Sequence, residues 1–183
     1  MGHILALEAG LDYETLVQMR ICEPLKMRST VITLSPELRA RLAVGHNKKG
    51  EPVENWDIPT LAGAGALRSS VNEMLIFAAA NLGLVRTDLS SAVETTHHPR
   101  DTTGVPGLDI AMGWHIWKQY GTQIVWHNGG TGGYRTFIGL DKKSKRGVVV
   151  LSNSINSVDD IGLHLLEGKF ELTEYHYKNK RSN

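Results

Sequence analysis

The sequence has a single cysteine, Cys22, among its 183 residues. An intrachain disulfide is therefore excluded, and the cysteine clusters that bind zinc are absent. The adjacent residues His97 and His98 are not accompanied by a carboxylate or cysteine that would complete a ligand set. We therefore expect no metal site and no cofactor, and we interpret Cys22 as a small buried hydrophobic residue.

The sequence also lacks a charge excess, a leader and a long apolar run. Its formal net charge is +1, which indicates no general attraction to nucleic acid or to acidic membranes. Met1–Glu8 has no basic leader, and no apolar stretch approaches the ~18 residues that span a bilayer. We expect a soluble protein without nucleic-acid or membrane partners, and nothing in the sequence indicates a compartment.

The residues that are present suit one folded domain over positions 1–183. Hydrophobic residues make up 41% and charged residues 21% of the chain, which is ordinary for a globular domain with a real core. The apolar spacing predicts a mostly helical part over residues 1–111 and three antiparallel strands with a C-terminal helix over residues 112–183. We find no internal repeat and no low-complexity linker.

Local signals place the individual elements. Helices are predicted over Met1–Ala9 with Gly10 as the stop, from Asp12 to before Pro24, from Ser35-Pro36, from the capping box Ser70 and Glu73, over residues 88–96, and from Asp159. Strands are predicted over residues 112–117, 134–140 and 147–151, and residues 45–60 are predicted to form a surface loop.

The most informative segment is rich in glycine and connects two strand-like runs. The apolar run Gln123–Trp126 enters it and the run from Tyr134 leaves it, with four glycines between them. Glycine permits a ligand to approach the backbone closely, so the segment suits a substrate lying against exposed backbone N–H groups. The ligand would bind by edge pairing, or as an anion held by several donors. A glycine-rich hairpin turn with a solvated histidine is the alternative interpretation.

This segment resembles a known active-site motif. The residues His127-Asn128-Gly129-Gly130-Thr131-Gly132-Gly133-Tyr134 resemble the third motif of the serine β-lactamase and penicillin-binding-protein superfamily, in particular its class C β-lactamase, D-alanyl-D-alanine peptidase and esterase branch. The resemblance implies an α+β, β-lactamase-like fold, in which an antiparallel sheet is flanked by helices. It also implies a serine hydrolase acting on β-lactams, D-alanyl peptides or small esters.

The same resemblance implies roles for site residues. His127, Asn128, Gly129, Gly130 and Thr131 would form the substrate-binding wall. Within it, His127 matches the residue that orients the substrate carboxylate, and Gly130 matches the residue whose backbone N–H is the second donor of the oxyanion hole. The implied ligand is a small molecule or peptide with a carboxylate or a carbonyl group.

Further segments extend the resemblance over nearly the whole chain. They match two segments of the family's helical lobe, the stretch before a helix beneath the active site, the strand that precedes the third motif, and a strand ending in Leu-x-Asn. In this sequence these segments are Glu8–Tyr13, Glu23–Thr30, Ala62–Ser70, Met112–Trp117 and Leu151–Asn153.

Two motifs of the family are missing from the chain. The nucleophile motif is Ser-x-x-Lys, in which the lysine lies one helical turn beyond the serine and takes its proton, and no serine here has a lysine three residues later. The second motif, Tyr-x-Asn, matches only Tyr177-Lys178-Asn179, which follows the third motif instead of preceding it. We assign no catalytic residue and predict a truncated family member, without the N-terminal strands and the nucleophile helix, that is inactive alone.

Three hypotheses about function follow. The first is a partial serine hydrolase, which acts only when another polypeptide supplies the serine and the lysine, or which is a fragment of a longer enzyme. A chain that lacks part of its sheet should leave a strand edge uncovered, so a homo-oligomer or a complementing chain is expected there. A non-catalytic ligand-binding or self-assembling module with the same fold is the alternative. The third hypothesis is new catalysis with His127, His115 or His46 as base and a nearby serine. Separately, Ser69 and Ser70 follow a glycine-rich turn, which suggests a nucleophile. Helix capping already explains Ser70.

Overall fold

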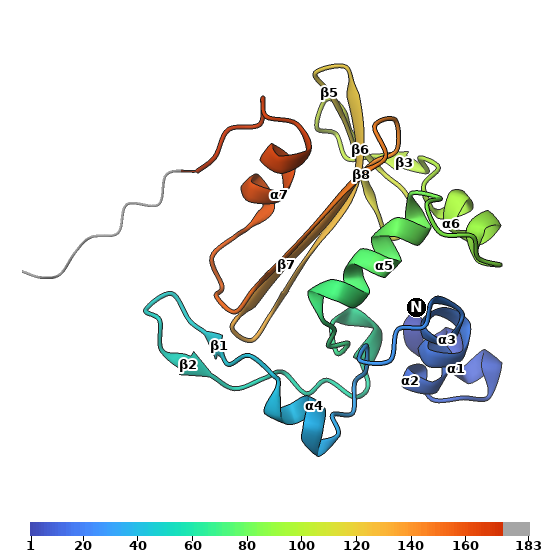
Figure 1. Cartoon of the computed structure of the whole chain (residues 1–183), viewed down its shortest axis with the longest axis vertical. Coiled ribbons are helices and arrows are strands. Elements are labelled where there is room, and N and C mark those ends of the chain that lie inside the picture. Colours follow the sequence, from blue (N-terminus) through green and yellow to red (C-terminus); the bar gives the residue numbers. More distant parts are fainter. Residues whose placement is uncertain (174–183) are drawn as a thin grey trace, which may run out of the picture.

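The computed structural model describes residues 1–173. Within that part of the chain the main sheet has six antiparallel strands in sequence order. Helix α5 covers one face of the sheet and helix α7 covers the other (Figure 1). The strands are β3 (Asp101–Thr102), β4 (Leu108–Ile110), β5 (His115–Gln119), β6 (Thr122–Thr131), β7 (Tyr134–Asp141) and β8 (Arg146–Ser152).

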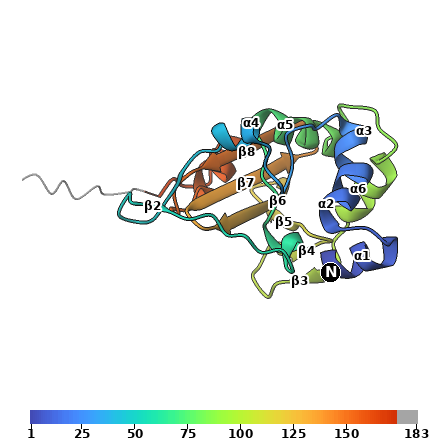
Figure 2. The same cartoon turned by 90° about the horizontal axis from the view of Figure 1, so that it is seen from below.

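Helices α1, α2, α3 and α6 form a separate lobe. Figure 2 shows α1, α2, α3 and α6 together beside the sheet. The helical elements are α1 (Gly2–Ala9), α2 (Tyr13–Val17), the π-helical turn η1 (Gln18–Cys22), α3 (Glu23–Leu25), α4 (Pro36–Ala40), the 3₁₀ turn η2 (Ala62–Ala64), α5 (Val71–Asn81), α6 (Ser90–Thr96) and α7 (Asp159–Leu166). A small hairpin pairs β1 (Gly45–His46) with β2 (Pro52–Val53).

Each face of the sheet buries its own apolar cluster. On the α5 face, Ile116, Val125 and Leu140 are completely buried together with Ala78 and Leu82. On the α7 face, Ile124 and Phe137 are buried against Leu163 and Leu166 of α7. Alternate residues of β6 therefore belong to opposite clusters, as expected for a strand that is covered on both faces.

The structure confirms the α+β class with an antiparallel sheet between helices, but it differs from several predicted boundaries. Three strands were predicted after residue 111, but the structure has four there: β5, β6, β7 and β8. The two short strands β3 and β4 extend the sheet in front of them. The loop predicted over residues 45–60 contains the hairpin β1–β2, whose two-residue strands are too short to show an apolar alternation.

Pro24 does not end the second helix. The chain widens into the π-helical turn η1, whose backbone closes by a bond from the N–H of Glu23 to the carbonyl of Gln18. It then continues through Pro24 in α3. Proline is tolerated because it lies in the first turn of α3, where its missing N–H is not required.

Only one of the two hydrogen bonds of the capping box predicted for α5 is present. Ser70 accepts a hydrogen bond from the backbone N–H of Glu73, as predicted. The carboxylate of Glu73, however, accepts from the N–H of Ser29 and from the hydroxyl of Thr30, both at 2.6 Å. This buried carboxylate therefore joins α5 to the segment after α3 instead of completing a capping box.

Candidate functional site

Half of strand β6 has no neighbour on one side. Strand β5 pairs with β6 only from Thr122 to Trp126, whereas β7 pairs with β6 as far as Thr131. Residues 127–131 therefore form an edge of the sheet, and its end lies next to the segment that contains η2. This is the segment that the sequence predicted as a substrate-binding wall, and the structure places its five residues together on one strand.

The register shows which backbone groups face this edge. The two-residue turn Gly132-Gly133 makes Thr131 and Tyr134 the pair that closes the hairpin, and in such a hairpin the closing pair is hydrogen-bonded. Because hydrogen-bonded pairs alternate along antiparallel strands, the N–H and C=O groups of Asn128 and Gly130 point away from β7. Within residues 1–173, neither residue bonds to another segment through its backbone.

Side chains of β7 lie against the two central glycines. A Cβ added at Gly129 would lie 2.6 Å from the hydroxyl oxygen of Thr136. A Cβ added at Gly130 would overlap Nη1 of Arg135 and lie 2.8 Å from its Cζ. The side chains of Thr136 and Arg135 therefore occupy the space above these glycines. Sequence reasoning missed both residues, because it attributed the glycines to the ligand alone.

The side chain of Asn128 is engaged within the protein. Its amide Nδ2 donates to Oδ2 of Asp159 at 2.6 Å, which joins β6 to the start of α7. Asp159 was predicted as the cap of this helix, and that prediction was wrong. The N-cap residue is Val158, and no side chain caps it. Asn128 therefore contributes its backbone to the edge, while its side chain positions α7.

The imidazole of His127 lies beside a second histidine. The rings of His127 and His115 are stacked with centroids 5.6 Å apart, and His115 also contacts the ring of Trp126 at 5.1 Å. Burial, and then the neighbouring His127, lower the pKa of His115 below its ordinary value. His127 is the exposed histidine of the pair.

The opposite wall of the site is formed by the segment that contains η2. A Cβ at Gly65 would lie 3.0 Å from Cγ2 of Thr131, so this segment lies directly against the end of β6. A Cβ at Gly132 would lie 2.8 Å from the ring of Trp56, whose side chain is 55% exposed. The tip of the hairpin is therefore enclosed by the chain between β2 and α5.

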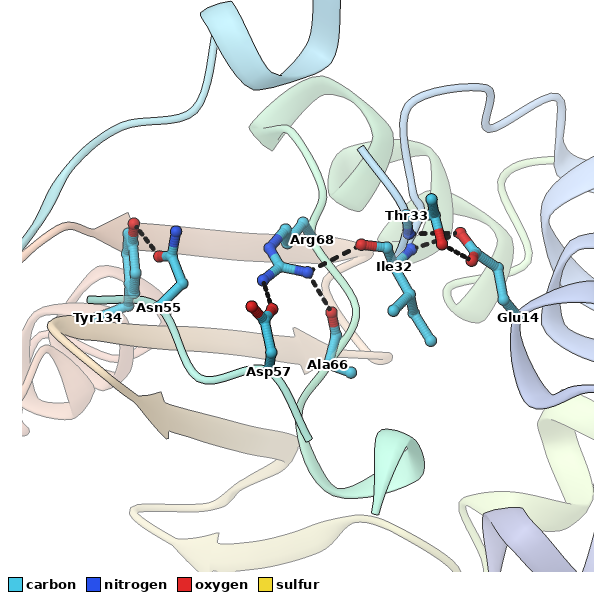
Figure 3. A network of polar contacts seen from close by, with 8 residues as sticks. All are labelled: Glu14, Ile32, Thr33, Asn55, Asp57, Ala66, Arg68 and Tyr134. Atoms are coloured by element: carbon cyan, nitrogen blue, oxygen red, sulfur yellow. Dashed lines mark hydrogen bonds and ion pairs between the residues drawn. The ribbon is translucent and has the colours of Figure 1, made fainter. Parts of the chain in front are cut away.

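Polar contacts hold this segment in place (Figure 3). The guanidinium of Arg68 donates to the carbonyl of Ile32 at 2.8 Å and forms an ion pair with Asp57 at 2.9 Å. The hydroxyl of Tyr134, the last motif residue, lies 2.8 Å from Oδ1 of Asn55. These bonds connect the helical lobe, the segment before α5 and strand β7.

The two serines that follow the glycine-rich turn have partners other than a histidine. The Ser69 hydroxyl shares a hydrogen bond of 2.7 Å with Thr30, and Ser70 caps α5. The ring of His46 contacts the carbonyl of Asn153 at 3.1 Å. Tyr177-Lys178-Asn179 lies outside the described residues. The third hypothesis, catalysis by a new serine and histidine pair, therefore gains nothing from Ser69 or Ser70 and stays a prediction.

The described part of the chain contains no group of three or more His, Cys, Asp or Glu side chains placed to hold a metal ion. Among the helices of residues 1–173, none is both long enough and apolar enough to span a bilayer. The candidate site at the edge of β6 offers backbone groups, a histidine and an arginine.

Comparison with known proteins identifies the family of this fold. Residues 1–166 match the family model named Beta-lactamase. The chain is 30% identical over 161 residues to the Homo sapiens protein beta-lactamase-like 1, covering 82% of this chain and 31% of that protein. It is 30% identical over 175 residues to the Unguisins hydrolase ungD' of Aspergillus campestris, covering 84% of this chain and 32% of that protein.

Solved structures agree with this match. A class C beta-lactamase superposes with a TM-score of 0.82 at 20% identity, covering 94% of this chain and 55% of the other. The class C beta lactamase of Rhodobacter sphaeroides gives a TM-score of 0.77 at 23% identity and covers 85% of this chain and 53% of the other. The chain thus spans about half the length of these structures and about a third of the curated relatives. It is a partial β-lactamase-like fold, and the chain belongs to the beta-lactamase family.

Proposed function

We propose that this chain is the substrate-binding part of a serine hydrolase of the beta-lactamase family, and that a polypeptide segment outside the chain supplies the nucleophile. The observation that carries the proposal is the open edge of β6. The backbone groups of Asn128 and Gly130 point away from β7, on the side of β6 that β5 leaves uncovered, and the chain has no Ser-x-x-Lys.

The edge suits acyl transfer. An extended amide or ester can pair with the outward groups of Asn128 and Gly130 as an additional strand. Its reacting carbonyl oxygen then accepts a hydrogen bond from the N–H of Gly130, which stabilises the negative charge that develops when a serine attacks. A donor without a nucleophile binds but forms no acyl-enzyme, so the chain is inactive alone.

A second open strand edge supports the proposal that another segment completes the sheet. Within residues 1–173, β8 pairs only with β7, so its other side presents unpaired N–H and C=O groups. Exposed apolar side chains lie on β8 and on α7, which packs against it: Leu151 is 42%, Leu165 57% and Ile161 39% exposed. We propose that a complementing chain pairs with β8 and supplies the serine and its lysine.

Self-assembly through β8 is the alternative that the same observation favours. In that case two copies of the chain pair at the open edge, and the protein is a non-catalytic module that binds ligands at β6. The two proposals differ in what restores activity. A complementing segment produces turnover, whereas self-association produces a stable dimer without turnover.

The test is reconstitution. The chain is mixed with the part of the human relative that precedes the matched region, and hydrolysis of nitrocefin and of p-nitrophenyl butyrate is followed. We expect no turnover by either part alone and turnover by the mixture. Replacing by alanine any serine of the added segment that is followed three residues later by a lysine should abolish it. A mixture that forms a complex but remains inactive, while the chain alone is a dimer, would support the self-assembling module instead.

A further inference from the structure

A groove between helix α4 and the chain that follows β2 has no part in the proposed function. It consists of two adjoining clefts of about 290 Å³ and about 400 Å³, which share the residues Arg39, Asn55 and Asp57. Small-molecule sites in proteins occupy roughly 300–1,000 Å³. The groove therefore suits a ligand the size of an amino acid or a dipeptide.

Polar contacts hold the two sides of the groove together. The hydroxyl of Tyr134 lies 2.5 Å from the carbonyl of Ala43 on one side and 2.8 Å from Oδ1 of Asn55 on the other (Figure 3). Arg68 fixes Asp57 through their ion pair of 2.9 Å. These contacts preform the groove. Its apolar lining includes Ile32 and Leu34 in the first cleft and Leu42, Val44 and Val53 in the second.

Two opposite charges in the groove lack partners. Arg39 of α4 and Glu54 after β2 both line the second cleft, and among residues 1–173 neither side chain belongs to an ion pair. The other two charges that line the groove, those of Arg68 and Asp57, neutralise each other. Since Tyr134 contacts only Oδ1 of Asn55, the amide Nδ2 of that residue remains a further donor. The groove thus offers one free cation and one free anion beside an apolar surface.

We propose that this groove binds a small zwitterion, an amino acid or dipeptide with an apolar side chain. The guanidinium of Arg39 holds its carboxylate through two parallel hydrogen bonds, and Glu54 pairs with its ammonium group. The apolar side chain of the ligand contacts Leu42, Val44 and Val53. A carboxylate alone would be repelled by Glu54 and an ammonium alone by Arg39, so the groove selects a molecule with both charges. This site is separate from the proposed function, because the backbone of the β6 edge does not line it.

The test compares ligands that differ in one charge. L-leucine and L-leucyl-L-leucine carry both charges, their N-acetyl forms lack the ammonium group, and their C-terminal amides lack the carboxylate. Each is titrated into the ¹⁵N-labelled chain, and the backbone signals of Leu42, Val44 and Val53 are followed. We expect at least one of the two zwitterions to bind about tenfold more tightly than its N-acetyl form and its amide, because a charge-assisted pair contributes more than a neutral hydrogen bond.

Variants assign each charge of the ligand to its partner. Arg39→Gln should weaken binding of the zwitterion to the level of its amide, because the carboxylate loses the guanidinium. Glu54→Gln should weaken binding to the level of the N-acetyl form, because the ammonium group loses the carboxylate. The matched controls are Arg41→Gln and Glu37→Gln, which remove exposed charges on or next to α4 that do not line the groove. Both controls should leave the two preferences unchanged.

The inference is overturned if neither zwitterion shifts the signals of the groove, if the N-acetyl forms or the amides bind as tightly as the zwitterions, or if Arg39→Gln and Glu54→Gln keep both preferences. Shifts confined to Thr131 and its neighbours on β6 would place the ligand at the edge of the sheet and would overturn it as well. These results are independent of reconstituted turnover, so the groove and the proposed hydrolase can fail separately.

Discussion

Single buried polar side chains set the pH range in which this fold is stable. His97 is 4% exposed, its Nε2 lies 3.0 Å from Oδ1 of Asn81, and its ring contacts the edge of Trp114. Burial, assisted by the charge of Lys142, lowers the pKa of His97 to about 4. The buried site therefore favours the neutral imidazole.

We predict that the free energy of unfolding decreases as the pH falls from about 6.5 to about 4. In this window the unfolded chain binds a proton at His97 and the folded chain does not, so stability increases with pH. Between pH 7 and pH 5 the loss attributable to His97 should be about 2 kcal/mol. Urea unfolding at the two pH values, for the natural chain and for His97→Gln, measures it. An unchanged pH dependence in the variant would show that other groups are responsible.

At the scale of elements, helix α7 depends on a glycine at its contact with β7. A Cβ at Gly162 would lie 2.5 Å from Cγ of Phe137, which is 1% exposed. Because Gly162 has no side chain, α7 can pack closely on the sheet at this position.

Gly162→Ala should destabilise the protein by about 1–2 kcal/mol. Alanine gains about 1 kcal/mol in helix propensity, but an additional methyl group in a filled core costs about 1–3 kcal/mol or more when its neighbour is rigid. Because Phe137 has no free space to move into, we expect the packing term to exceed the propensity term. Chemical denaturation measures the change, with Gly168→Ala, whose Cβ would meet no atom within 4 Å, as the matched control. A stabilised Gly162→Ala variant would contradict this account of α7.

Local signals predicted those elements whose cause is local. Gly10 ends α1 in the left-handed conformation, with φ of 65°, and Ser35 accepts the N–H of Leu38 at the start of α4. Asp12 likewise accepts the N–H of Thr15. These features depend on residues within four positions, which a single sequence displays directly.

Features that depend on distant contacts were not predicted. Asp159 is a residue type that often caps helices, but its side chain accepts a hydrogen bond from Asn128, 31 residues earlier. Similarly, the side chains of Thr136 and Arg135 occupy the space above the motif glycines Gly129 and Gly130. These residues lie across the hairpin, and only the strand register shows that they are neighbours. The motif predicted a candidate site on β6, and the structure adds that the side chains of Thr136 and Arg135 lie against its glycines.

At the scale of the whole molecule, the open strand β8 should control association. Leu151 is 42% exposed at this edge, and a charged residue there discourages strand pairing. We predict that Leu151→Lys abolishes or weakens by about tenfold any self-association of the chain and its complex with a complementing segment, without lowering the folded fraction. Analytical ultracentrifugation of both mixtures measures this. Lys143→Leu, a change of similar size in the exposed turn between β7 and β8, is the control. Unaltered association in Leu151→Lys would place the interface elsewhere.

The central claim is that this chain binds substrate and that the nucleophile belongs to another segment. Intact-mass spectrometry after incubation with a fluorophosphonate probe tests it most directly, because the probe forms a stable adduct only with an activated serine. We predict no adduct on the folded chain alone. In the reconstituted mixture, we predict one adduct on the added segment and none on this chain. A stoichiometric adduct on any serine of this chain would contradict the account, since it would show an activated nucleophile in the absence of Ser-x-x-Lys.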